Sequence, residues 1–418
     1  MISEGKLNSQ KSILPLFFMV LTTIAGQLIY LRFLSLYHIV IISLFIMVCI
    51  KTGYVFLGKT FSIMFFLAIW TFEAMISIIW APDKWLALQY IYYIFLIAAM
   101  CVIFHNYIKK DNIEKYAIFM VWVLFVCNII AMWETVTGNH LIPNYLSSPV
   151  RLRLLKYVPG TFFRNPNDFA TFIIMIIPFS LAMSQRKKIR IIAIFNIIGA
   201  FFSIFASQSR TQIIMLCIMY ICFGLFFDKK RFFTFAAFFF AAIAVFYTIY
   251  PDFKNLIDIG LKSISTEEII SSTQGGSLGV RIALLKNGLH ILIDTFGFGI
   301  GAGCHRAVMA EYASRYFSTG NIVVMHNLVG EIFVDYGLII GILFIVTIIW
   351  SIKKLIVIYK INDNIIIRQL AIYFVILLVL FPICGISSSS ILQLTSLWLS
   401  FCFIGAFIKV NDIEEINQ

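Results

Sequence analysis

The sequence predicts an all-α, polytopic integral membrane protein with about twelve transmembrane helices in a single domain, residues 1–418. Hydrophobic residues make up 61% of the chain and charged residues 12%, whereas a soluble domain has about 45–50% and about 25%. Apolar runs recur along the chain, close to the roughly 20 residues that a helix needs to cross a bilayer. Basic clusters fall between alternate runs, which is the pattern of a chain that crosses a membrane repeatedly.

The predicted spans are separated by polar turns and one long polar segment. They lie at 13–30, 33–50, 61–80, 85–104, 117–133, 168–183, 191–207, 211–227, 232–250, 327–350, 366–384 and 392–408. Only Leu31 and Arg32 divide the first two spans. The start of the chain has no small-residue cleavage pattern, so we expect the first helix to be retained and not removed as a signal peptide.

Lys and Arg near the span ends predict the orientation, because these residues concentrate on the cytoplasmic side. The main clusters are "KKDNIEK" (109–115), "RKKIR" (186–190), "DKKR" (228–231) and "KKLIVIYK" (353–360). With alternating spans they share one side, which predicts cytoplasmic N- and C-termini. The long segment 251–325, between spans nine and ten, is then extracytoplasmic. It contains a predicted amphipathic helix near 280–292, whose leucines are spaced to lie on a membrane surface or on the bundle.

Three arginines on the predicted outer face are candidate anion ligands. Arg164 precedes the sixth span in "GTFFRNPNDFA", where Asn167 and its polar neighbours can cap the helix and the helix N-terminus favours an anion. Arg210 lies in the outer turn "SQSR", against the positive-inside bias, although snorkelling to the interface is the alternative. Arg281 opens the predicted amphipathic helix. Since the long segment carries equal numbers of acids and bases, an anion site there needs particular arginines.

The stretch "VVMHNLVGEIFVDYG" (323–337) marks the return of the chain into the membrane. His326 and Asn327 stand at the mouth of the tenth span. Glu331 and Asp335 follow four residues apart, and hence on one helix face. Acids inside a span are costly and are usually functional or paired. A histidine beside carboxylates is a candidate general base, although a single interfacial histidine is more often structural.

The stretch "GFGIGAG" (297–303) has glycine at every second position. It lacks the full Gly-x-Gly-x-x-Gly dinucleotide fingerprint. One interpretation is a tight turn that closes the amphipathic helix. The other is a backbone that passes close to a diphosphate, because glycine leaves room for a ligand. In that case Gly299 and Gly301 contact the ligand, with His305 and Arg306 as secondary candidates.

The residue types on the predicted outer face limit the kinds of chemistry that the protein can perform. It has no Asp-x-Asp pair and no histidine cluster with metal-ligand spacing, so we expect no metal and no cofactor. Arginine holds phosphate bidentately and keeps its charge, so this residue set suits a diphosphate leaving group. The eight cysteines form no disulfide pattern. Glu73 is a further buried acid in the third span, where pairing with a neighbour is the expected explanation.

The chain resembles the O-antigen ligase and O-antigen polymerase family, best between Trp133 and Leu338. The segments that carry the resemblance are, in order, "WETVTGNHLIP" (133–143), "GTFFRNPNDFA" (160–170), "SQSRTQ" (207–212), "GVRIALLKNG" (279–288), "FGFGIGAG" (296–303) and "HNLVGEIFVDYG" (326–337). The resemblance implies a metal-independent, inverting glycosyltransferase of the bacterial cytoplasmic (inner) membrane that uses an undecaprenyl-diphosphate-linked glycan. Arg210 and Arg281 are expected to hold the diphosphate, and His326 to activate the acceptor hydroxyl.

The resemblance leads us to expect a polymerase that joins lipid-linked repeat units of O-antigen or capsule on the outer face of the membrane. The alternative is a ligase that passes the glycan to lipid A core or another acceptor. A flippase for the same lipid is less favoured, because transporters place charges and broken helices near the bilayer midplane. Expected partners are the glycan donor and acceptor, the bilayer, and possible flippase and chain-length regulator proteins, but no nucleic acid. The expected substrate-binding residues are Arg164, Asn167, Asn327, Glu331, Gly299, Gly301 and Arg306.

Overall fold

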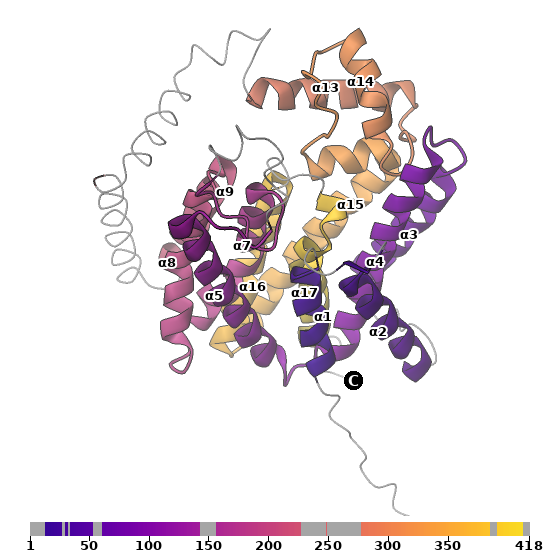
Figure 1. The fold of residues 1–418 in the computed structure, drawn as a ribbon. Helices are drawn as coiled ribbons and strands as arrows, with labels where there is room; N and C mark the ends of the chain where they lie inside the picture. The colour runs from indigo at the N-terminus through magenta and orange to yellow at the C-terminus, as the bar shows by residue number, and fades with distance from the viewer. Residues whose placement is uncertain are drawn as a thin grey trace, which may run out of the picture.

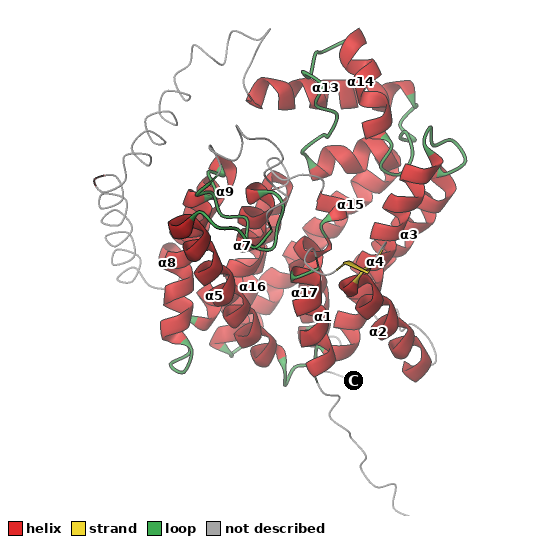
Figure 2. Ribbon diagram, viewed as in Figure 1, coloured by secondary structure: helices red, strands yellow, loops and turns green. Residues whose placement is uncertain are grey.

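The computed structural model describes residues 13–26, 30–31, 34–52, 61–142, 156–226, 248, 277–384 and 391–412. Within these ranges helices joined by turns and loops make up the fold, together with a two-residue antiparallel ladder between β1 (Tyr30–Leu31) and β2 (Leu34–Ser35) (Figure 2). The prediction of an all-α fold is confirmed for this part of the chain. Figure 1 shows the helices as an upright bundle with two further helices at one end.

Most helices coincide with predicted spans. They are α1 (Leu14–Ile24), α2 (Leu36–Thr52), α3 (Phe61–Ser77), α4 (Lys84–Tyr107), α5 (Ile113–Thr137), α7 (Pro166–Met183), α8 (Arg190–Ala206), α9 (Arg210–Phe226), α13 (Ser277–Asp294), α14 (His305–Arg315), α15 (Leu328–Ile361), α16 (Ile365–Cys384) and α17 (Leu399–Asn411). Among the described helices, five are long and apolar enough to cross a membrane: α4, α5, α7, α15 and α16. These lengths support an integral membrane protein. Apart from Thr248, the predicted span 232–250 lies outside the described residues, and the number of twelve spans stays a prediction.

Three predicted spans end or begin differently in the structure. The first ends at Ile24 and not at 30, and Tyr30 belongs to the short ladder with β2. The tenth continues to Ile361 and not to 350, because Ser351, Leu355 and Ile358 are buried and extend the packed face of α15. The last predicted span begins with two 3-10 turns, η2 (Ile391–Gln393) and η3 (Thr395–Trp398), and only then becomes α17. The side chain of Trp398 donates to the carbonyl of Ile391 and closes these turns at 3.2 Å.

Helix α7 lies in the interior of the bundle and packs against α5, α8, α9 and α16. Its first turn is capped by Asn165, whose side chain accepts the backbone N–H of Asn167 at 2.9 Å. Polar side chains join α7 to its neighbours: Asn196 of α8 donates to Ser180 of α7 at 3.1 Å. Hydrogen bonds of this kind and small residues are typical of helix contacts inside a bilayer.

Helices α13 and α14 lie at one end of the bundle, which we call the cap end (Figure 1). The helix predicted near 280–292 is α13, and it runs across the bundle and not along it. The two helices share a small apolar core with the start of α15. It consists of Leu284, Ile291, Met309, Tyr312, Met325 and Val334. The cap is therefore packed directly on a membrane-spanning helix.

Candidate functional site

Residues 295–304 connect α13 to α14 and form what we call the glycine loop. Gly297, Gly299, Gly301 and Gly303 have φ values of 78, 83, 107 and 67°. Side chains strongly disfavour this region of φ, which glycine enters at little cost. The alternation of glycines in the sequence thus corresponds to a repeated left-handed backbone conformation.

The glycine loop lies against a break in α15. Gly337 interrupts this helix with φ 81° and ψ 179°. Backbone hydrogen bonds cross from loop to helix: Ile300 N–H to Val334 O at 2.9 Å, Gly301 N–H to Asp335 O at 3.0 Å, and Leu338 N–H to Gly297 O at 2.8 Å. These bonds satisfy groups that the break removes from the helical ladder.

Glycine is required here by close contact as well as by φ. A Cβ on Gly299 would lie 2.6 Å from the backbone nitrogen of Gly337, and one on Gly301 would lie 2.8 Å from the Cβ of Ala81. Both positions therefore face protein. Packing explains the two glycines, and their predicted contact with a ligand stays a prediction.

A buried histidine–carboxylate pair joins the glycine loop to α15. His305 is the first residue of α14, and its Nδ1 lies 2.8 Å from Oδ2 of Asp335. The backbone N–H of His305 donates to Oδ1 of the same carboxylate at 2.8 Å. Both side chains are fully buried. Burial opposes the charged imidazolium, but the carboxylates of Asp335 and Glu331 outweigh this effect and raise the pKa of His305.

The turn between α3 and α4 covers the other side of the glycine loop. The indole N–H of Trp80 donates to Gly299 O at 3.1 Å, and Ala302 N–H donates to Ser77 Oγ at 3.1 Å. The guanidinium of Arg306 lies 5.8 Å from the ring centroid of Tyr90. The predicted secondary candidates His305 and Arg306 are thus parts of a packed junction between three segments of the chain.

Glu73 of α3 lies close enough to Asp335 to interact electrostatically. Its two carboxylate oxygens are buried and make no hydrogen bond to the described residues. The expected pairing of Glu73 with a neighbour is therefore not seen in this part of the chain. Nor do any three His, Cys, Asp or Glu side chains of the described residues lie together as metal ligands would.

The residues predicted at the mouth of the tenth span form the first turns of α15. Asn327 is the N-cap, and its side chain accepts the backbone N–H of Gly330 at 2.9 Å. His326 precedes it with a φ of 49° and is half-buried. A histidine in this region is held there by its surroundings, and such positions cluster at functional sites. Glu331 is buried one turn further along the helix.

Arg210 and Arg164 stand beside a second group of contacts at the cap end. Arg210 begins α9, and two residues later the side chain of Gln212 donates to Thr171 of α7 at 2.8 Å. Thr171 in turn donates to the carbonyl of Asn167 at 2.8 Å. Arg164 is exposed just before the N-cap of α7. The hydrogen bonds therefore hold the starts of α7 and α9 together, with an arginine beside each.

Arg281 belongs to α13 and is half-buried. Burial lowers the pKa of its guanidinium from the ordinary value, although arginine remains charged over the physiological range. Because α13 packs against α15, Arg281 shares the cap with His326 and the glycine loop. The predicted residues therefore lie in two groups. One is at the starts of α7 and α9, and the other is on the segment from α13 to α15.

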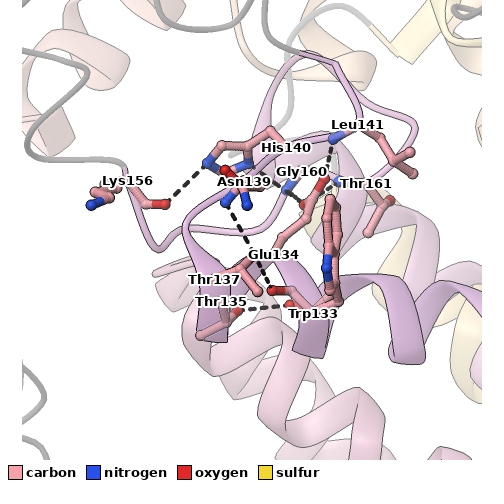
Figure 3. Close-up of polar contacts among 11 residues, drawn as sticks. Trp133, Glu134, Thr135, Thr137, Asn139, His140, Leu141, Lys156, Gly160 and Thr161 are labelled. Carbon is pink, nitrogen blue, oxygen red and sulfur yellow. Dashed lines mark hydrogen bonds and ion pairs between the residues drawn. The ribbon is translucent and has the colours of Figure 1, made fainter.

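Sequence reasoning missed Glu134 at the end of α5, which organises the segment before α7 (Figure 3). Its carboxylate accepts backbone N–H groups from Leu141 at 2.9 Å, Gly160 at 2.8 Å and Thr161 at 2.8 Å. His140 Nδ1 lies 3.7 Å from the same carboxylate, and this contact raises the pKa of His140. We call these residues the Glu134 cluster. A single acid at the end of an apolar span was the available signal.

Comparisons with known proteins show what the chain is similar to. Residues 195–346 match the family model described as O-antigen ligase. The chain is also 29% identical over 298 residues to the teichuronic acid biosynthesis protein TuaE of Bacillus subtilis (strain 168), a match that covers 66% of this chain and 57% of that protein. No solved structure matches. The region matched by the family model includes Arg210, Arg281, the glycine loop and His326, and the two likenesses support the resemblance to the O-antigen ligase and polymerase family.

Proposed function

We propose that this protein is a membrane glycosyltransferase that polymerises undecaprenyl-diphosphate-linked repeat units of a surface polysaccharide. The observation that carries the proposal is the position of His326. It has a left-handed backbone conformation directly before the Asn327 cap, at the start of a helix that the glycine loop holds in place. The active site then lies at the cap end, on the extracytoplasmic side of the bacterial cytoplasmic membrane.

The proposed reaction is a single displacement at the anomeric carbon of the donor sugar. His326 takes the proton of the acceptor hydroxyl as its oxygen forms the new glycosidic bond. The bond from the anomeric carbon to the diphosphate oxygen breaks, and undecaprenyl diphosphate leaves with the electron pair. One displacement inverts the anomeric centre.

Arginines supply the charge that the leaving group needs in this proposal. Arg210 and Arg281 hold the diphosphate, because a guanidinium donates two parallel hydrogen bonds and keeps its charge. Fixed cations aimed at developing negative charge lower the barrier without a metal or cofactor. Arg164, Arg306 and the polar groups of Asn167, Asn327 and Glu331 are the further substrate contacts that we propose, together with Gly299 and Gly301.

A ligase that transfers the glycan to lipid A core or another acceptor is the second candidate, since the matching family model is described as O-antigen ligase. A polymerase is favoured because any envelope built from lipid-linked repeats needs one, whereas a ligase needs a particular acceptor. A lipid-linked glycan flippase is less favoured, because Arg164, Arg210 and His326 lie at the starts of helices. In either enzyme, flippase and chain-length regulator proteins are the expected partners.

Reconstitution with one defined undecaprenyl-diphosphate oligosaccharide tests the proposal. A ladder of products longer than the substrate supports a polymerase. Product only after a second acceptor is added supports a ligase and contradicts polymerisation. Purified His326→Ala protein, treated identically, controls for a contaminating activity.

A further inference from the structure

Helix α13 has two apolar faces, and the described residues of the chain cover only one of them. Leu284 and Ile291 are buried against α14 and α15. A second set at a spacing of three or four residues points the other way and is between 41 and 62% exposed. It consists of Ile282, Leu285, Leu289 and Ile293. This spacing places them in one line along the helix, which we call the α13 stripe. On a water-facing helix these positions would be polar.

The α13 stripe continues into the glycine loop. Phe296 is 89% exposed and Phe298 is 67% exposed. Between them, Gly297 lies directly on Leu338 of α15: a Cβ on this glycine would be 2.7 Å from Leu338 Cδ1. Leu338, Ile339 and Ile342 are themselves exposed. They belong to a helix with the length and composition of a membrane span. One apolar surface therefore runs from α13 through the two phenylalanines onto the side of α15.

Tryptophans mark the level at which this surface meets water. Trp80, in the turn between α3 and α4, and Trp85, in the first turn of α4, are exposed. Trp80 is fixed to the glycine loop by its hydrogen bond to Gly299 O. Exposed tryptophans at the ends of spans are typical of the membrane interface. The glycine loop, which carries Phe296 and Phe298, is therefore hydrogen-bonded to a tryptophan of the kind found at the membrane interface.

Helix α14 provides the contrast within the same cap. Its exposed residues include Glu311, Ser314 and Arg315, and Arg315 pairs with Glu311 at 3.0 Å. On α13, by comparison, Lys286 lies beside the stripe with its ammonium 4.8 Å from the ring of Phe317. A basic residue beside an apolar stripe is the pattern of a helix that lies in the membrane interface. The exposed side of α14 is therefore suited to water, whereas the exposed side of α13 is suited to the membrane interface.

We propose that the α13 stripe, with Phe296 and Phe298, lies in the lipid leaflet at the cap end, so that α13 is an interfacial helix. The bilayer is the occupant that the surface favours, because the stripe is continuous with the lipid-facing side of α15. A second protein would have to cover part of that side as well. Burial of exposed apolar area in lipid stabilises this position.

The proposal predicts the depth of Arg281 in the membrane. This residue lies between the buried face of α13 and the stripe, and hence beside the headgroups. A lipid-linked substrate has its diphosphate at that depth. This consequence rests on the proposed function, whereas the position of α13 in the leaflet does not.

A lipid-quenching experiment tests the proposal on the intact protein. Leu289→Cys protein is labelled with a maleimide carrying the fluorophore NBD and reconstituted in nanodiscs, with or without phosphatidylcholine that carries a doxyl group near the headgroup. Ser314→Cys, on α14, is the matched control. Wild-type protein labelled in the same way corrects for the native cysteines. We expect the doxyl lipid to quench the label at 289 and to leave the label at 314 unchanged.

Equal fluorescence at 289 with and without the doxyl lipid would overturn the proposal. A label at 289 with blue-shifted emission but no quenching would also overturn it, because its surroundings would then be apolar protein and not lipid. Phe296→Cys gives a second position whose side chain is almost fully exposed, in case the first variant does not fold. If the label at 289 is quenched but the reconstituted protein shows no glycosyl transfer, the position of α13 in the leaflet is supported. Only the proposed function is then contradicted.

Discussion

His305 makes two hydrogen bonds to the single carboxylate of Asp335, one from its backbone N–H and one from its ring, both at 2.8 Å. His305 begins α14, whereas Asp335 lies on α15 two residues before the break at Gly337. The pair therefore joins the cap to a membrane-spanning helix through atoms that water does not reach. Its energetics can be tested separately from catalysis.

Asp335→Asn keeps the size of the side chain but removes the charge that stabilises the His305 imidazolium. Loss of one partner from a buried pair costs about 3–5 kcal/mol, so we expect a clear fall in the thermal unfolding temperature in detergent. Glu311→Gln is the matched control. It removes an exposed ion pair on α14 and should cost no more than about 1 kcal/mol. Equal shifts for the two variants would contradict a stabilising role for the buried pair.

Stability should depend on pH through His305. Its pKa is raised in the folded protein from an ordinary value of 6.5. A raised pKa means that the folded state binds the proton more tightly. The stabilisation is therefore complete below the unfolded pKa and is lost as pH rises through the folded pKa. We expect the difference in unfolding temperature between wild type and His305→Gln to shrink from pH 6 upward. A difference that grows with pH would show that the imidazole is neutral in the fold.

Gly299→Ala should weaken the junction between the glycine loop and α15. The residue has a φ of 83°, and an added Cβ would lie 2.6 Å from Gly337 N. The left-handed conformation alone costs a side chain about 1–2 kcal/mol, and the contact adds to it. Gly279→Ala on α13 is the control with the opposite expected sign, since a Cβ there meets nothing within 4 Å and alanine favours a helix. Hydrogen exchange of residues 295–304 would report the difference.

His326→Ala should abolish glycan elongation while the protein still accumulates in the membrane. A positioned general base contributes about 10²–10⁴ in rate, so polymer should disappear on gels of surface polysaccharide. Arg281→Ala is expected to have the same effect through loss of diphosphate binding. The exposed Arg315 of α14 supplies the control: Arg315→Ala should leave polymer length unchanged. Normal polymer in either site variant would remove that residue from the mechanism.

Arg210→Lys separates charge from geometry. Lysine keeps the positive charge but lacks the planar fork that binds two phosphate oxygens. We expect a large loss of transfer with the reconstituted donor, and a smaller loss at saturating donor if binding is the main defect. Activity equal to wild type would mean that Arg210 does not bind the diphosphate through its fork.

The positions of the helices could be predicted because a bilayer demands long apolar runs, and such runs are visible in one dimension. The end of α15 at Ile361 could not, because it depends on burial of Ser351, Leu355 and Ile358 by other helices. The 3-10 turns before α17 likewise depend on local hydrogen bonds and not on hydropathy.

The site was only partly predictable, for a similar reason. The sequence marks His305 and Asp335 as candidates for separate reasons, since they are 30 positions apart in the chain. Their pairing follows from the left-handed turns of the glycine loop. The partners of Glu134 are backbone N–H groups at Leu141, Gly160 and Thr161. Any residue type supplies such groups, so no side-chain motif records them.

The close fit of the glycine loop on α15 also determines where the protein can be modified. Alternate residues from Gly297 to Gly303 each have a required conformation, and hydrogen bonds to α15 set the length of the loop. An affinity tag or reporter inserted there would shift every later contact by its own length. The turn at Gly320 has open space around it and lies between α14 and α15. It is the better place in the cap for a label that must not disturb the membrane helices.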